Sequence, residues 1–400
     1  MITKSRYLVI GLFFFVFFSL FPIFQYYGMS YYLILAASLL MICIYYIKFH
    51  ASINYNFFIF IFFALIFSSI TSIYWGGSLK ISLYPLAMII GLYYAIHLDS
   101  REYNYIVSIF TVISIIMLIG AYLGFVYALA GGAPIFSIKN PDNRTSWLYL
   151  TTFTNARIGR IIRPSGFFDE PGALSFFICI TAMLRNINKR NSKITLLLLF
   201  TGFITLSLAH LVYVIFHLLS MSYKKKSQIK NLLIIFTAFM TFLFTTNIGN
   251  TIFLNIFNRV KTNLELNSSN KDIRISQFQN AYKELLSSKV DNILFSLDPY
   301  FMDKDHFIAK REYPRIGENL LTPLSYYGIL ISWVYYFYLF YLILYGLKNR
   351  ENRIFIGLAM LLIQRPYITA IGYSAIIFLP FFMNRKIYKM QIKLKKTGKE

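Results

Sequence analysis

Residues 157–172 have the sequence RIGRIIRPSGFFDEPG, and the apolar run ALSFFICITAML at 173–184 follows directly. Three arginines at three-residue spacing therefore lead into a turn that is rich in proline and glycine and carries two adjacent carboxylates. Most of the chain on either side consists of apolar runs of the kind that form membrane-spanning helices. A charged turn between such runs lies at one edge of a bilayer. Cations clustered there suggest an anionic lipid head group as the ligand.

Apolar residues dominate the composition of the chain. Of its 400 residues, 57% are hydrophobic and 14% are charged, and the mean hydropathy is +0.58. This profile is far from that of a soluble domain. We therefore expect an all-α polytopic membrane protein. The first apolar run, Tyr7 to Phe24, has no small-x-small cleavage site after it and further spans follow at once, so we expect a retained helix rather than a signal peptide.

The apolar runs predict about twelve transmembrane spans, because a span needs ~20 mostly apolar residues. The pairs 194–222 and 354–383 are each short for two crossings, and we predict two short helices in each rather than one long tilted helix. The predicted spans are about 7–25, 31–47, 57–74, 81–97, 104–130, 172–184, 194–207, 209–222, 231–246, 320–346, 354–366 and 369–383.

The net charge of +23 follows the predicted topology. With a cytoplasmic amino terminus, the short inner segments contain about 22 of the 39 Lys and Arg residues but only about 4 of the 16 Asp and Glu residues. Short loops rich in Lys and Arg stay on the cytoplasmic side. We therefore predict that both termini are cytoplasmic, and the charge does not indicate nucleic-acid binding.

Two predicted outer loops, about 131–171 and about 247–318, are too long to be simple connectors. The second loop contains an amphipathic run at 273–288 that predicts a helix. Its apolar face would carry Ile273, Phe278, Tyr282 and Leu285. No internal repeat or linker divides the chain, so we expect residues 1–400 to form a single integral membrane domain with these two external loops.

Motifs of soluble enzymes are absent from the sequence: it has no P-loop, no dinucleotide-binding glycine pattern, no HExxH and no GxSxG. The five histidines and two cysteines show no metal-ligand spacing, so we predict neither a metal nor a cofactor. His210, near the turn between two short spans, reads as a satisfied polar residue. The remaining candidates for chemistry are charged residues on the outer face.

Arg157, Arg160 and Arg163 are the first candidates. On a helical turn their spacing would present all three guanidinium groups in one row, and guanidinium binds phosphate oxygens in a fork. The alternatives are contact with lipid head groups, or pairing with Asp169 and Glu170. We favour a substrate role for at least one of the three, and for Arg163 above the others.

Glu318-Asn319 stands where the second loop re-enters the membrane. A carboxylate there could act as a general base beside an apolar wall, or the pair could cap the following helix. Arg365 is the only charge in the last helix pair, and such a residue usually faces the bundle interior. Arg274, taken alone, would more often form a surface salt bridge.

Residues 163–173 resemble the Arg-x-x-Gly-x-Phe-x-x-Pro turn of the Wzy-type polymerases of O-antigen and capsule repeat units, and of the related O-antigen ligases. Arg274 followed by Phe278 is similar to the start of the helix in that family's second outer loop. Glu318-Asn319 with Gly328 resembles the exit of the same loop. Ligases typically have His where this chain has Glu318, which favours a polymerase. The Thr205–His210 segment lacks the Ser-Arg often found there.

The resemblance implies transfer of a growing glycan from undecaprenyl pyrophosphate to the terminal sugar of another lipid-linked repeat unit. The leaving group is an anionic lipid pyrophosphate, so the reaction needs fixed cations and a base. The implied catalytic residues are Glu318, Arg163 and Arg274, and the implied substrate-binding residues are Arg157, Arg160, Arg315, Arg365, Gly166, Glu170 and Asn319.

The implied setting is the inner (plasma) membrane of a bacterium, with the active site on the extracytoplasmic side. The implied partners are the undecaprenyl-pyrophosphate-linked oligosaccharide and the bilayer, with a chain-length regulator as a further candidate. Alternatives are an O-antigen ligase and a flippase for the same lipid-linked oligosaccharide. The nearly charge-free spans and the absence of related halves favour chemistry at the outer face over transport.

Overall fold

The fold is mostly helical, with 13 α-helices in the part of the chain that the structure describes. The chain clusters into two compact units, residues 1–214 with 367–400, and residues 215–366. The computed structural model describes residues 4–26, 31–49, 55–74, 79–139, 145–158, 161–221, 278–279, 281–283, 285–286, 290–295, 319–366 and 371–396.

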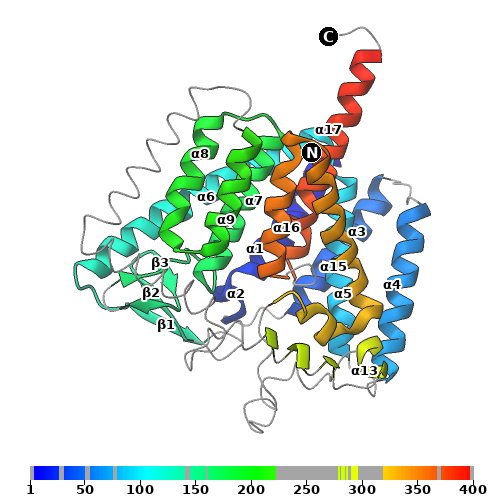
Figure 1. Cartoon of the computed structure of the whole chain (residues 1–400), viewed down its shortest axis with the longest axis horizontal. Helices are drawn as coiled ribbons and strands as arrows, with labels where there is room; N and C mark the ends of the chain where they lie inside the picture. Colours follow the sequence, from blue (N-terminus) through cyan, green and yellow to red (C-terminus); the bar gives the residue numbers. More distant parts are fainter. Residues whose placement is uncertain are drawn as a thin grey trace. The chain divides into compact units, whose positions relative to one another are not determined.

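Helices up to residue 221 coincide with the predicted apolar runs (Figure 1). Pro22 divides the first run because proline suits the first turn of a new helix. The predicted span at 231–246 lies outside the described residues. The helices are α1 Lys4–Leu20, α2 Pro22–Tyr26, α3 Tyr31–Phe49, α4 Tyr55–Tyr74, α5 Leu79–His97, α6 Ser100–Leu129, α7 Pro171–Ile187, α8 Ser192–Thr201 and α9 Leu208–Met221.

Each of the two short apolar stretches, 194–222 and 354–383, forms two separate helices, as the sequence predicts. The 3₁₀-helix η1, Gly202–Thr205, follows α8, and Leu206 then takes a left-handed conformation with φ 49° that ends the run before α9. Likewise α16, Arg353–Gln364, is separate from α17, Tyr373–Lys396. By length and composition, two of the described helices could cross a membrane: α6 and α15, Thr322–Lys348.

Helix α7 forms the centre of the first unit. Every residue from Pro171 to Arg185 is buried, which is expected of a helix that is covered on all sides. Phe177 packs against Phe17 of α1 and Phe110 of α6, with ring centroids 5.7 and 5.1 Å apart. Helix α7 therefore fixes whatever is attached to its amino terminus, which is the turn that ends at residue 170.

The first predicted outer loop contains β-structure, so the expectation of an all-α chain is wrong for this loop. Strands β1 Phe136–Lys139, β2 Thr145–Tyr149 and β3 Thr152–Thr154 form an antiparallel sheet in the order β1-β2-β3. Strands β4 Arg157–Ile158 and β5 Ile161–Ile162 form a second antiparallel pair. Strands β2, β3 and β5 all contact α6. Figure 1 shows the β1–β3 sheet beside one end of α6.

Two glycines of α6 let the turn between β2 and β3 approach the helix closely. A Cβ atom at Gly124 would lie 2.5 Å from the Tyr149 carbonyl oxygen, and one at Gly120 would lie 3.1 Å from the Thr151 carbonyl oxygen. The Thr151 hydroxyl donates to the Gly120 carbonyl at 2.6 Å. Small residues four apart allow a backbone to approach a helix in this way, and they anchor the sheet to α6.

In the second unit, α15 contacts α13, Val290–Phe295, and α16. Gly328 interrupts α15 with a φ of 64°, and the Tyr335 hydroxyl donates to the Leu362 carbonyl of α16 at 2.9 Å. Of the predicted amphipathic face, Leu285 is buried together with Ala281 against Leu321 and Leu324.

Phe278 and Tyr282 are 41% and 52% exposed, so the prediction of a shared apolar face is wrong for these two residues. Ile273 lies outside the described residues.

Candidate functional site

The turn that follows Arg163 is clamped onto strand β3. The Ser165 N–H donates to the Phe153 carbonyl and the Phe153 N–H donates to the Gly166 carbonyl, both at 2.8 Å. The Gly166 N–H in turn donates to the Thr152 hydroxyl oxygen at 2.8 Å. Ser165 and Thr152 are fully buried. Two segments of the outer loop, residues 152–153 and 165–166, are therefore held together as one rigid piece.

Gly166 is required by backbone conformation. Its φ is +60°, in the left-handed region where a side chain costs about 1–2 kcal/mol. A Cβ there would lie 3.5 Å from the Met117 Cβ, which is ordinary contact. The buried glycine shapes the turn, and its implied role in substrate binding stays a prediction.

The guanidinium of Arg163 is held by backbone carbonyls at the end of η1. Its Nε donates to the Thr205 oxygen at 3.2 Å, and its Nη2 donates to the Leu206 oxygen at 3.1 Å. These contacts link the outer-loop turn to the segment between α8 and α9. Both acceptors are neutral backbone oxygens, and these two bonds orient the guanidinium.

The imidazole of His210 packs against η1. Its Nε2 lies 2.7 Å from the Leu199 carbonyl, which can only accept, so Nε2 carries a proton. Its Nδ1 lies 3.2 Å from the Ser175 hydroxyl and 3.4 Å from the Cys179 sulfur of α7. The prediction of a satisfied polar residue is confirmed.

The position of His210 also gives it a role that the sequence did not reveal. A Cβ atom at Gly202 would lie 2.5 Å from the imidazole Cε1, so the first residue of η1 rests directly on the ring. The ring lies edge-on to Phe203, with centroids 5.1 Å apart. His210 thus fixes the segment whose carbonyls hold Arg163.

Arg157 points away from this segment. It pairs across the β4–β5 ribbon with Ile162, so Arg163, the next residue along, leaves the ribbon on the other side. The Arg157 guanidinium lies over the Trp147 ring, 5.3 Å from its centroid. The predicted helical row of arginines is therefore wrong, because the backbone at Arg157 is extended. Arg160 lies outside the described residues.

Two aromatic side chains of β2 are engaged in the sheet. Tyr149 is buried against Ala128 and Ile162, and Trp147 packs on the same cluster. The Tyr149 ring is therefore enclosed, and the Trp147 ring stacks with the Arg157 guanidinium.

Glu170 is the residue before the first turn of α7. It is buried, its backbone is extended, and Pro171 follows as the first helical residue. A carboxylate at a helix amino terminus interacts favourably with the helix dipole. The neighbouring Asp169 accepts a hydrogen bond from the Ser146 hydroxyl through its backbone carbonyl at 3.3 Å.

In the second loop the structure describes only Asn319 among the candidate residues. Arg274, Arg315 and Glu318 lie outside the described residues, so their roles stay predictions. Asn319 is buried, and its Oδ1 accepts from the Leu321 N–H at 2.8 Å. Its own N–H donates to the Thr322 hydroxyl at 2.8 Å. Asn319 therefore forms a turn that precedes α15. The N-cap of α15 is Leu321, with no side-chain capping bond, so the prediction of a helix cap at Asn319 is wrong.

Arg365 is the C-terminal cap of α16. It follows the last residue of α16, its N–H donates to the Leu361 carbonyl at 2.9 Å, and its side chain is only 6% exposed. Burial agrees with the predicted orientation toward an interior rather than toward lipid head groups.

A second buried arginine, Arg185, was not among the candidates from the sequence; it lies at the start of residues 185–193, one of the short segments predicted to be cytoplasmic. Arg185, at the end of α7, donates to the Thr195 hydroxyl, the Thr111 hydroxyl and the Asn191 carbonyl at 3.1, 2.9 and 3.1 Å. It joins α6, α7 and α8. The charge pattern that predicts a cytoplasmic loop here gives no sign of this role.

Among the described residues, no three His, Cys, Asp or Glu side chains lie close enough together to hold a metal ion. No protein-family model, curated protein or solved structure matches the chain.

Proposed function

We propose that the chain is an integral membrane polymerase of a bacterial surface polysaccharide. It would transfer a growing glycan from undecaprenyl pyrophosphate to the terminal sugar of another lipid-linked repeat unit, on the extracytoplasmic side. The proposal rests on the motif resemblance, on the twelve predicted spans, and on the way Arg163 is held.

The arrangement at Arg163 is the observation that carries the proposal. Its guanidinium is oriented by the backbone carbonyls of Thr205 and Leu206 at the end of η1. Its backbone leads into the turn that is hydrogen-bonded to β3. A pre-oriented guanidinium stabilises negative charge as it develops, because the enzyme need not reorganise during the reaction. The departing lipid pyrophosphate is where such charge accumulates.

The other roles come from the resemblance. Arg274 would share the pyrophosphate with Arg163, supported by Arg160, Arg315 and Arg365, and Glu318 would accept the proton of the attacking sugar hydroxyl. The bond that breaks joins the anomeric carbon to the pyrophosphate oxygen, and the bond that forms joins that carbon to the acceptor oxygen. Undecaprenyl pyrophosphate leaves with the bonding electrons.

The test is reconstitution of the purified protein in liposomes with lipid-linked repeat units from the organism that carries the chain. We expect a ladder of products without added metal or nucleotide. Arg163→Ala and Glu318→Gln should abolish the ladder, while Lys139→Ala, which removes an exposed charge from the same outer loop, should leave it unchanged.

Three results would contradict the proposal. An undiminished ladder from Arg163→Ala would remove that residue from the mechanism. Movement of lipid-linked sugar across the bilayer without a ladder would identify a flippase. Transfer that occurs only when lipid A-core is added would identify a ligase.

A further inference from the structure

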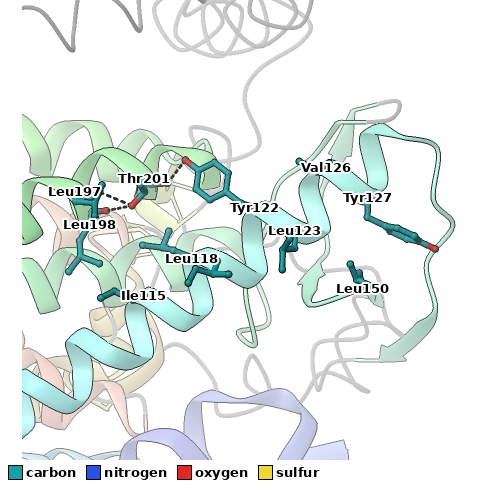
Figure 2. Close-up of a pocket in the computed structure, with 11 residues that line it drawn as sticks. Ile115, Leu118, Tyr122, Leu123, Val126, Tyr127, Leu150, Leu197, Leu198 and Thr201 are labelled. Carbon is teal, nitrogen blue, oxygen red and sulfur yellow. Dashed lines mark hydrogen bonds between the residues drawn. The ribbon is translucent and has the colours of Figure 1, made fainter.

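An apolar cavity of about 570 Å³ lies between α6, α8 and the turn that joins β2 to β3 (Figure 2). The volume is that of an ordinary ligand pocket. Helix α6 forms one wall, Leu197 and Thr201 of α8 form another, and Leu150 of the turn forms the third. Polar atoms at its edge are satisfied within the protein, because the Tyr122 hydroxyl donates to the Thr201 carbonyl at 3.1 Å.

Leu150 is unusual for its position. It has a φ of 55°, a left-handed conformation that costs a leucine about 1–2 kcal/mol and that turns usually assign to glycine or asparagine. Its side chain is nevertheless 45% exposed at the cavity. The turn is held on α6 through Gly120 and Gly124, so Leu150 cannot withdraw. An apolar side chain fixed at an open apolar cavity favours an apolar occupant.

The cavity opens onto a row of exposed apolar residues along α6. Val112, Ile116, Ile119, Leu123 and Val126 are each 51–60% exposed. In a membrane protein such a row faces hydrocarbon. The cavity is therefore continuous with the surface that bilayer lipids would cover.

A cation is linked to the cavity through one buried cluster. Tyr127, which lines the cavity, and Trp147 both pack against the cluster of Ala128, Tyr149 and Ile162. The guanidinium of Arg157, an exposed residue, lies over the Trp147 ring. Tyrosine and tryptophan gather where hydrocarbon meets the head groups. The cavity thus suits the acyl chain of an anionic lipid. The aromatic pair suits the boundary between its acyl chains and its head group, and the cation suits its phosphate.

We propose that this site binds an anionic glycerophospholipid of the outer leaflet, with one acyl chain in the cavity and the phosphate at Arg157. The lipid would bind α6, α8 and the β1–β3 sheet together. The inference rests on the membrane placement proposed above and is independent of the polymerase reaction. It also assigns Arg157 a task different from pyrophosphate binding.

The test uses Trp147 as a reporter of lipid binding. The chain has three tryptophans, and replacing Trp75 and Trp333 by phenylalanine leaves Trp147 alone. The protein is placed in phosphatidylcholine vesicles containing rising fractions of dibrominated phosphatidylglycerol, whose bromine quenches nearby tryptophan. We expect quenching to saturate at about a fivefold lower fraction than with dibrominated phosphatidylcholine, the factor that one nearby cation contributes.

Two matched pairs of variants locate the site. Val126→Phe fills the cavity, so the saturable part of the quenching should disappear. Val112 is on the same exposed row but outside the cavity, so Val112→Phe should keep the saturable quenching. Arg157→Ala should remove the preference for phosphatidylglycerol, and Lys139→Ala should keep it. Equal helix content and elution volume establish that each variant is folded.

Equal quenching by both lipids at every fraction, unchanged by Val126→Phe, would overturn the proposal and leave only general solvation by the bilayer. Displacement of the brominated lipid by trace undecaprenyl phosphate would also overturn it, because the cavity would then belong to the carrier lipid. Neither result depends on polymer formation. The proposed reaction therefore stands or falls separately.

Discussion

A single methyl group added at Gly202 tests the contact between η1 and the His210 ring. Gly202 has an ordinary helical φ of −63°. Helix propensity alone therefore predicts that Gly202→Ala stabilises the protein, by about 1 kcal/mol in a helix interior. The structure predicts the opposite sign, because the new Cβ would lie 2.5 Å from the His210 Cε1 and 2.8 Å from its Nε2.

The imidazole has little room to yield. It is fully buried, bonded to the Leu199 carbonyl and packed on Phe203. Moving it breaks that hydrogen bond and leaves the buried Nε2–H without its acceptor, which costs about 1–3 kcal/mol. We expect Gly202→Ala to lower the free energy of unfolding by about 2 kcal/mol and to displace the carbonyls that hold Arg163, so polymer formation should also fall.

The measurement is denaturant unfolding of the purified protein in detergent, combined with the liposome assay. The double variant Gly202→Ala/His210→Ala separates the causes. Once the ring is gone, the nearest remaining atom is the Ile178 Cγ2 at 3.3 Å, a contact that a shift of a few tenths of an ångström relieves. The double variant should therefore be about as stable as His210→Ala alone. Gly131→Ala is the control for added bulk, since nothing lies within 4 Å of a Cβ there and only its φ of 90° is strained.

A Gly202→Ala protein as stable and active as the parent would refute the reasoning. Additive losses in the double variant would do the same, because they would show that the two positions do not touch.

Three further variants test the rest of the framework. Gly166→Ala should cost about 1–2 kcal/mol of unfolding free energy from backbone strain alone, and a larger loss would reveal a collision that the geometry does not contain. Thr152→Val deprives the buried Gly166 N–H of its acceptor and should cost about 1–3 kcal/mol of unfolding free energy. Thr152→Ser keeps the hydroxyl and should recover most of this loss. Equal losses in both variants would show that the hydroxyl does not contribute to stability. Arg185→Met removes three hydrogen bonds and should cost about 3 kcal/mol, measured by unfolding in detergent, and an unchanged midpoint would show that the bonds are dispensable.

The helices could be predicted from the sequence because their rule is local. A backbone in hydrocarbon satisfies its own hydrogen bonds only as a helix, so each long apolar run specifies a helix by itself. The separation of α8 from α9 was also predicted, but the backbone conformation that separates them was not. A left-handed leucine at Leu206, held by Arg163, ends η1 without a glycine.

The outer loop could not be predicted in the same way. Its strands are two to five residues long, too short to register as a pattern, and they are held by contact with α6. The arginine spacing fits a helix as well as a ribbon. What decides between them is the pairing of Arg157 with Ile162, which is set by the docking of the loop. Gly120 and Gly124 were a usable signal, since glycines four apart in an apolar run mark a close backbone approach.

Arg163 and Arg185 show why counting charges by loop gives orientation but not roles. Both guanidinium groups donate to neutral oxygens on a neighbouring element, so neither is a simple surface cation. Arg185 is buried among acceptors from two helices and a helix cap, which is a bracing arrangement. Arg163 is only half-buried, and its two backbone contacts fix its direction. A cation that is oriented and still partly open to solvent is the one suited to a ligand, and this difference supports Arg163 over Arg185 as the residue for the pyrophosphate.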